Sequence, residues 1–146
     1  MHFLNLISQF ENSFDFTPVV DFIWPFIAKN DISHDYSHIY RVLKNALEIW
    51  KEAGKQGDPD IIIAGVLFHD IIVYPKNSKQ ADLSTTHSAE KASKCLSEQG
   101  FPNDKIEIIC EIIKNCSFSR GKRLPYIESD ILQDADMLES TGVLSL

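Results

Sequence analysis

The sequence predicts an all-helical fold, and three observations support this prediction. Apolar residues between positions 39 and 50 recur every three or four residues, which is the spacing of one face of a helix. The most apolar stretch, residues 61–68, has no partner segment that resembles a strand. Hydrophobic residues make up 44% of the chain and charged residues 24%, as in ordinary globular proteins. We expect one domain, residues 1–146, with its own core.

The first half of the chain contains four predicted helices. The first covers residues 3–10, and the second covers residues 18–28, with Pro25 disturbing it. The third begins after Asp31 or Ser33, either of which can cap it, and ends at Gly54. The fourth begins at Asp58-Pro59, a cap followed by a proline in the first turn, and runs through residues 61–72. Because this helix is apolar on nearly all sides, we expect it at the buried centre.

The second half of the chain contains three further predicted helices. They cover residues 84–98, residues 103–116, and a last segment that begins near Glu128. On the last helix we expect Ile131, Ala135 and Leu138 to face inward. Loops are expected at residues 75–78 and at the basic segment 119–125.

Charge limits the partners of this chain. The net charge is −7, which disfavours a nucleic-acid polymer, because such polymers bind to basic surfaces. A small anionic substrate remains compatible with this charge, since a metal and a few nearby lysines can offset it.

The chain is expected to work in the cytoplasm, away from membranes. Its three cysteines are odd in number and form no Cys-x-x-Cys pair, which favours a reducing compartment over a disulfide framework or a zinc ribbon. The first residues lack the basic segment and long apolar core of a signal peptide. Residues 61–68 are too few to cross a bilayer.

The pair His69-Asp70 is the first sign of chemistry. It follows eight consecutive apolar residues, and an unpaired carboxylate at the end of a buried helix is costly. A salt bridge, a raised pKa or a metal would remove that cost. The adjacent histidine favours a metal, because imidazole and carboxylate are both ligands of divalent ions.

Two more residues are predicted to join this pair as metal ligands. His38 lies one helical turn before Val42, at the edge of an apolar stripe, and Asp134 is expected on the inward side of the last helix. Asp136 and Glu139 are expected to be solvated acids, Asp136 being the likelier exception. Two histidines and two aspartates suit one octahedral ion such as Mn, Mg, Co, Ni or Fe, with two positions left for water and substrate.

The chain resembles a known family in several ordered segments. They are HDYSHIYRV (34–42), GVLFHDIIVYPKN (65–77), HSAEKA (87–92), CSFS (116–119) and LQDADMLESTGV (132–143). Over residues 30–146 the chain is similar to the HD-domain superfamily of metal-dependent phosphohydrolases. Within it, the chain looks like a subfamily of small bacterial proteins that includes nucleotide pyrophosphohydrolases.

The resemblance implies an HD-domain helical bundle whose central buried helix carries the His-Asp pair. It also implies hydrolysis of a small nucleotide, foremost a nucleoside triphosphate to the monophosphate and pyrophosphate, with Asp70 helping to orient water. A monophosphate phosphatase is the next candidate. Hydrolysis of guanosine tetraphosphate is less favoured, because Val73-Tyr74-Pro75 replaces an acidic pair. The alternative from another class is a non-catalytic HD module that binds a metal or a nucleotide.

The chain departs from the subfamily in two respects. Cys116 and Ser78 stand where histidines are usual. The family also continues for tens of residues past the Asp-Ala-Asp motif, so we expect this chain, which stops at Leu146, to be either a short or a truncated member.

Substrate contacts are predicted at four basic residues. His34 either contacts phosphate as a catalytic residue or is a helix-start residue. Arg41 either holds a ligating carboxylate or substrate, or forms a surface salt bridge. Lys76 either binds a substrate phosphate, which the resemblance favours, or is a solvated loop lysine. Arg120 either attracts a nucleotide or belongs to a solvated basic loop. His87 is interpreted as a residue of the helix start and not as a ligand.

Overall fold

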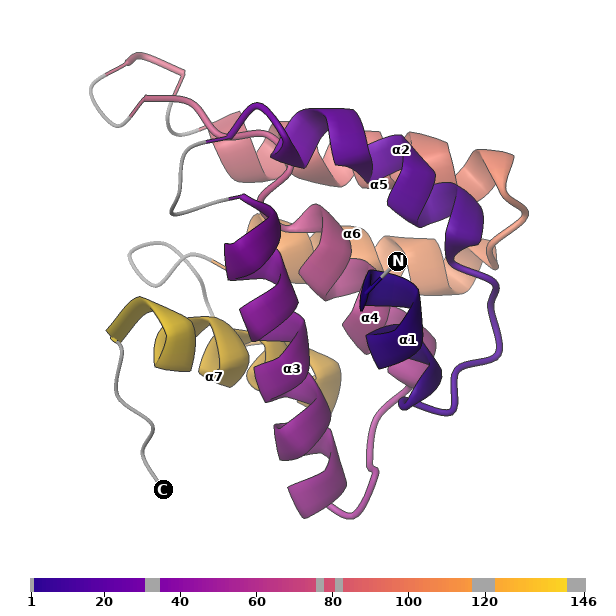
Figure 1. Ribbon diagram of the computed structural model, residues 1–146. Coiled ribbons are helices and arrows are strands. Elements are labelled where there is room, and N and C mark those ends of the chain that lie inside the picture. Colours follow the sequence, from indigo (N-terminus) through magenta and orange to yellow (C-terminus); the bar gives the residue numbers. More distant parts are fainter. Residues whose placement is uncertain (1, 31–34, 76–77, 81–82, 117–122, 142–146) are drawn as a thin grey trace.

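The computed structural model describes residues 2–30, 35–75, 78–80, 83–116 and 123–141. These residues form helices and no strands, which confirms the all-helical prediction. The helices are α1 (His2–Ser8), α2 (Thr17–Ile27), α3 (Tyr36–Glu52), α4 (Pro59–Phe68), α5 (Ser84–Glu98), α6 (Asn103–Lys114) and α7 (Ile127–Thr141). In Figure 1, α2 and α5 lie together at the top, and α7 lies beside α3 at the lower left.

Helix α4 is the centre of the bundle, as its sequence predicts. Each residue from Asp60 to Phe68 is buried, and the helix packs against α2, α3, α5, α6 and α7. The side chain of Asp58 caps its start by accepting the backbone N–H of Asp60. Such all-round burial removes a large apolar area from water and holds the ends of α4 in fixed positions.

Helix α4 ends earlier than predicted, at Phe68, with His69 as its C-terminal cap. The prediction that it continues through residues 61–72 was therefore wrong at its C-terminal end. The chain turns away because α5 provides other hydrogen-bond acceptors: Ser88 accepts from the Ile72 N–H, and Ser84 accepts from the Tyr74 N–H. The His69-Asp70 pair thus lies just beyond the helix end.

Helix α3 begins with a cap that the sequence analysis did not select. Asp35 accepts hydrogen bonds from the backbone N–H groups of Ser37 and His38. Asp31 and Ser33, the predicted caps, lie outside the described residues, and Asp35 takes the capping position. This cap fixes the first turn of α3, which carries His38.

The remaining helices cover α4 in pairs. Helix α5 packs along α6, and α3 packs along α7.

Pro25 does not end α2. The backbone N–H of Ala28 still donates to the Trp24 carbonyl, and the Pro25 side chain is exposed. None of the described helices is both long and apolar enough to span a membrane.

Candidate metal centre

Three parts of the chain bring four side chains together. His38 comes from the first turn of α3, His69 and Asp70 follow the end of α4, and Asp136 comes from α7. One ligand atom from each of the four lies within 4.8 Å of the others. This set of residues is called the metal centre below.

The distances within the metal centre fit a shared cation. Asp70 Oδ2 lies 3.3 Å from His38 Nε2 and 3.2 Å from His69 Nε2. Asp136 Oδ1 lies 3.4 Å and 3.5 Å from the same two atoms. Two ligand atoms that each lie about 2.1 Å from one ion are separated by about 3.0 Å at octahedral angles and about 3.4 Å at tetrahedral angles. The observed separations are close to these values and longer than ordinary charge-assisted hydrogen bonds.

The ring of His69 is oriented as a metal ligand requires. Its Nδ1 lies 2.7 Å from the carbonyl oxygen of Val66. Because a carbonyl can only accept, Nδ1 carries the proton, and in the neutral ring Nε2 presents its lone pair to the metal centre. The buried atoms His69 Nε2 and Asp136 Oδ1 have no hydrogen-bond partner among the described residues. Unpartnered buried polar atoms are rare in folded proteins, and a cation between these two would complete their contacts.

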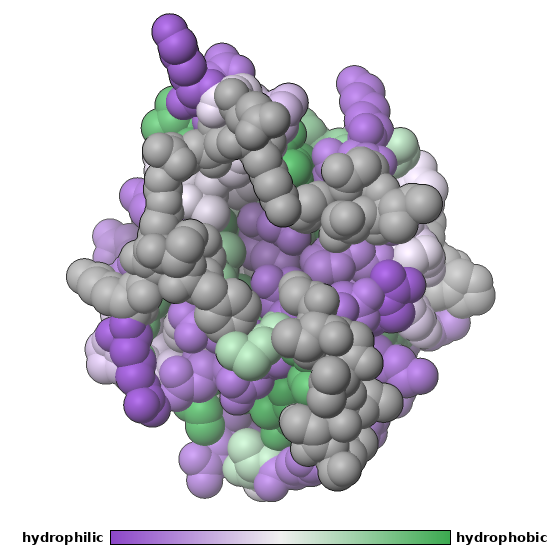
Figure 2. Space-filling view, turned by 90° about the vertical axis from the view of Figure 1, so that its left-hand side faces the viewer, coloured by the Kyte–Doolittle hydropathy of each residue, from purple (hydrophilic) through white to green (hydrophobic). Residues whose placement is uncertain are grey.

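The metal centre opens on its carboxylate side. The side chains of His69 and His38 are only 1% and 8% exposed, whereas those of Asp70 and Asp136 are 23% and 20% exposed. Figure 2 shows the face on the left of Figure 1, where α3 begins and α7 lies, and hydrophilic residues gather in the hollow at its centre. The carboxylates are therefore the solvent-facing part of the metal centre, with the imidazoles behind them.

The side chains of the metal centre shift one another's pKa values. Burial alone would lower the pKa of His38, but the neighbouring carboxylates of Asp136 and Asp70 outweigh it and raise that pKa to about 9. The pKa of His69 is also raised, because the two carboxylates outweigh its burial. Burial alone would raise the pKa of Asp136, but His38 and His69 hold it well below its usual range. The carboxylates thus attract positive charge, either protons on the imidazoles or a cation.

The prediction that Asp134 lies beside the histidines was wrong. Its side chain is exposed, and Asp136 occupies the position at the metal centre. The buried stripe of α7 includes Leu132 as well as Ile131 and Ala135, so it is rotated toward Asp136. Leu132, four residues before Asp136, was the signal in the sequence that could have identified it.

The other predicted site residues are divided between described and undescribed parts of the chain. His34, Lys76 and Arg120 lie outside the described residues, so their roles stay predictions. Arg41 Nε donates a hydrogen bond to Glu139 and not to a carboxylate of the metal centre. His87 lies outside the metal centre, and its Nδ1 is hydrogen-bonded to the hydroxyl of Tyr74.

Two asparagines that the sequence analysis missed support the metal centre. The Asn30 amide donates to the backbone carbonyl of Asp70 at 3.1 Å, and the Asn45 amide donates to that of Ala135 at 3.2 Å. Each holds the backbone at or next to a carboxylate of the metal centre. Asn45 lies seven residues after His38 on α3, hence on the same helix face, and this spacing was the available signal.

Cys116 lies outside the set of candidate ligands. Burial raises the pKa of its thiol to about 12, with Asp70 and Asp136 adding to the effect and His69 opposing it. The side chain is therefore a neutral, buried thiol that behaves as a small core residue near the metal centre.

A helical bundle with inward-facing histidines and aspartates defines a candidate metal-binding protein. The family model for the HD domain matches residues 35–141, a range that contains all four residues of the metal centre. Because this match covers more than half of the chain, the chain belongs to the HD-domain family. HD domains bind divalent metals, and most are metal-dependent phosphohydrolases. No curated protein and no solved structure matches the chain.

Proposed function

We propose that this chain is a metal-dependent phosphohydrolase that acts on a small nucleotide, foremost on a nucleoside triphosphate to release the monophosphate and pyrophosphate. The observation that carries the proposal is the convergence of His38, His69, Asp70 and Asp136 within 4.8 Å in an HD-domain chain. The subfamily resemblance of the sequence supports the choice of a nucleotide substrate.

The donor set fits one divalent cation, and Mn, Mg, Co, Ni and Fe are the candidates. Such an ion supplies Lewis acidity to a phosphoryl oxygen and lowers the pKa of water. His38 and His69 would hold the ion through their imidazole nitrogens, and Asp70 and Asp136 would bind it through their carboxylates and offset its charge. Asp70 is also exposed enough to orient the attacking water by hydrogen bonding.

Charge and access favour a small substrate over a polymer. The net charge of −7 repels long nucleic acids, whereas a mononucleotide needs only local cations around its phosphates. The opening on the carboxylate side admits the phosphate that reacts. Lys76 and Arg120 remain proposed contacts to the rest of the substrate.

A substrate screen tests this proposal. The protein is loaded with Mn, Mg, Co or Ni and offered nucleoside mono-, di- and triphosphates and a single-stranded oligonucleotide, and release of phosphate and pyrophosphate is measured. We expect turnover of a mononucleotide that a chelator abolishes and that Asp136→Asn removes. Tight metal binding without turnover of any substrate would favour the non-catalytic HD module, and cleavage of the oligonucleotide alone would contradict the substrate class.

A further inference from the structure

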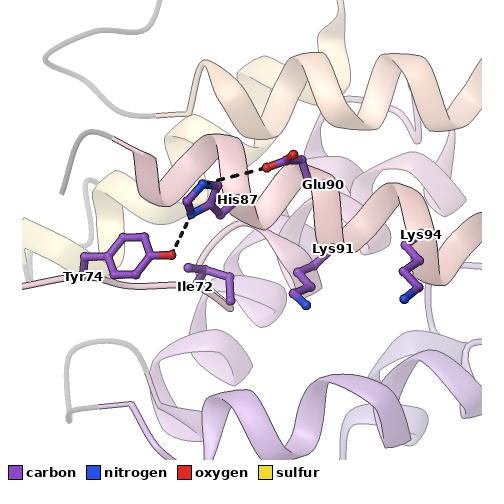
Figure 3. A pocket seen from close by; sticks show the side chains of 6 residues that line it. All are labelled: Ile72, Tyr74, His87, Glu90, Lys91 and Lys94. Atoms are coloured by element: carbon purple, nitrogen blue, oxygen red, sulfur yellow. Dashed lines mark hydrogen bonds and ion pairs between the residues drawn. The ribbon is translucent and has the colours of Figure 1, made fainter. Parts of the chain in front are cut away.

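A second set of side chains, outside the metal centre, lines an open pocket on α5 with a cavity volume of about 320 Å³. We call it the α5 groove; it is lined by Ile72, Tyr74, His87, Glu90, Lys91 and Lys94 (Figure 3). In Figure 3, Tyr74 and His87 close one end of the groove, and Lys91 and Lys94 extend along it.

Local structure explains why these residues share a surface. On α5, Glu90 and Lys91 follow His87 by three and four residues, and Lys94 follows it by seven, so the four side chains share one face of the helix. The segment that leaves Asp70 is held against α5, because Ser88 accepts from the Ile72 N–H and Ser84 accepts from the Tyr74 N–H. The groove is therefore built on the same segment that carries the metal centre.

The charges of the α5 groove suit an anion. Lys91 and Lys94 form no ion pair with any residue that the structure describes, and the Nζ of Lys91 lies 5.8 Å from the ring centroid of Phe26. Glu90 is largely exposed, and its carboxylate lies 4.0 Å from His87 Nε2. The ammonium groups of Lys91 and Lys94 are thus exposed beside one carboxylate, that of Glu90, on a protein whose net charge is negative. Lysine ammonium groups bind phosphate as point charges.

The Tyr74–His87 pair adds a directional donor. The Tyr74 hydroxyl oxygen and His87 Nδ1 are 2.7 Å apart. When the hydroxyl donates to Nδ1, the neutral ring carries its proton on Nε2. The carboxylate of Glu90, at 4.0 Å, is beyond hydrogen-bond distance of this nitrogen, so the N–H can donate to a phosphate oxygen.

One end of the α5 groove is close to the metal centre along the chain. Ile72 is two residues and Tyr74 four residues beyond Asp70, and four fully extended residues span at most about 14 Å. The end of the groove formed by Ile72 and Tyr74 therefore lies within this backbone distance of Asp70.

From these contacts we propose that the α5 groove is a polyphosphate subsite, in which Lys91 and Lys94 hold the phosphates of a nucleoside triphosphate that are remote from the reacting phosphorus. This role rests on the proposed function. The chemistry of the groove as a polyphosphate site can be tested without any turnover.

The first test measures binding of inorganic tripolyphosphate to the chelator-treated protein by calorimetry. We expect the double variant Lys91→Ala/Lys94→Ala to weaken binding about tenfold or more, because it removes two cations. The matched control is Lys44→Ala/Lys51→Ala, which removes two exposed lysines from α3 and should leave the affinity within about twofold. Asp136→Asn should also retain binding, so a failed metal centre cannot imitate a failed groove. Absence of binding, or equal affinities in the two double variants, would overturn the subsite.

The second test follows turnover of a nucleoside triphosphate by the metal-loaded protein. We expect the Lys91→Ala/Lys94→Ala variant to raise KM about tenfold with kcat nearly unchanged, and tripolyphosphate to inhibit the native protein competitively. If tripolyphosphate instead changed the rate without competing with substrate, the ligand would be a separate effector and the substrate assignment would be wrong.

Discussion

Arg41 of α3 donates a hydrogen bond to the carboxylate of Glu139 on α7, and this pair lies beside the metal centre. Arg41 follows His38 by three residues, and Glu139 follows Asp136 by three residues. The hydrogen bond from Asn45 to the Ala135 carbonyl is a second link between the same helices. Together these contacts hold α3 and α7 in the register that brings Asp136 to His38.

We expect Arg41→Ala to weaken divalent-metal binding several-fold while lowering the free energy of unfolding by only about 1 kcal/mol or less, because the Arg41 side chain is half exposed. Metal titration and urea unfolding measure the two effects. Arg123→Ala is the matched control. Arg123 forms an ion pair with Asp130, which lies on α7 like Glu139, but the Arg123 side chain is 87% exposed. A variant that lost stability but kept full metal affinity would show that the Arg41–Glu139 pair does not position Asp136.

Two aspartates on α7 provide a direct test of the ligand assignment. Asp136→Asn should lower the affinity for Mn at least about a hundredfold, since even the outer partners of metal ligands are typically worth ten- to hundredfold. Asp134→Asn changes an exposed carboxylate two residues away and should leave the affinity nearly unchanged. Calorimetric titration of both variants with Mn measures this difference. Equal losses in the two variants would contradict the assignment.

The metal-free protein should lose stability as the pH rises from neutral. The folded state raises the pKa of His38 to about 9 from an ordinary value of 6.5, so this contribution is complete below about 6.5 and disappears as the pH passes 9. The contribution of Asp136, whose pKa is lowered, is present above its ordinary value of 3.8 and is lost on strong acidification. Urea unfolding of chelator-treated protein between pH 4 and pH 9.5 tests this, with His38→Gln expected to flatten the alkaline decline. Stability that increased between pH 7 and pH 9 would refute it.

Metal binding should show the opposite dependence on pH. A metal and a proton compete for the imidazole nitrogens, so the affinity for a divalent ion should increase as His38 and His69 lose their protons. The gain in Tm on adding Mn should therefore be larger at pH 8.5 than at pH 6. A larger gain at pH 6 would mean that these imidazoles are not ligands.

The three cysteines should react slowly in the folded protein. Burial, with a smaller contribution from Glu98, raises the pKa of Cys95 to about 11, burial raises that of Cys110, and burial raises that of Cys116 to about 12. Because the thiolate is the reactive form, Ellman's reagent at pH 8 should label all three only after unfolding. Rapid labelling of Cys116 in the native protein, identified by mass spectrometry, would contradict its buried placement.

Local patterns determined most of the fold. The three- and four-residue spacing of apolar side chains predicts α3 with His38 on its inward edge, because a helix repeats every 3.6 residues. The unbroken apolar stretch 61–68 predicts a buried central helix, since only the middle of a bundle covers a helix on all sides. A histidine and an aspartate directly after that stretch predict a metal site for the same reason, because their burial needs compensation.

Contacts between distant segments of the chain determined the remaining features, namely which aspartate joins the metal centre, where α4 ends and which residue Arg41 contacts. Asp134 and Asp136 differ by two residues, or about 200° around a helix, so they lie on nearly opposite faces of α7, and the rotation of α7 about its own axis decides which of them meets the histidines. That rotation depends on packing against α3 and α4, which the periodicity of α7 alone does not define. The end of α4 likewise depends on Ser84 and Ser88, and the partner of Arg41 lies 98 residues further along the chain. The sequence by itself determined the helices and the ligand types, whereas tertiary packing decided which side chains meet, because only it sets the rotation and register of one helix against another.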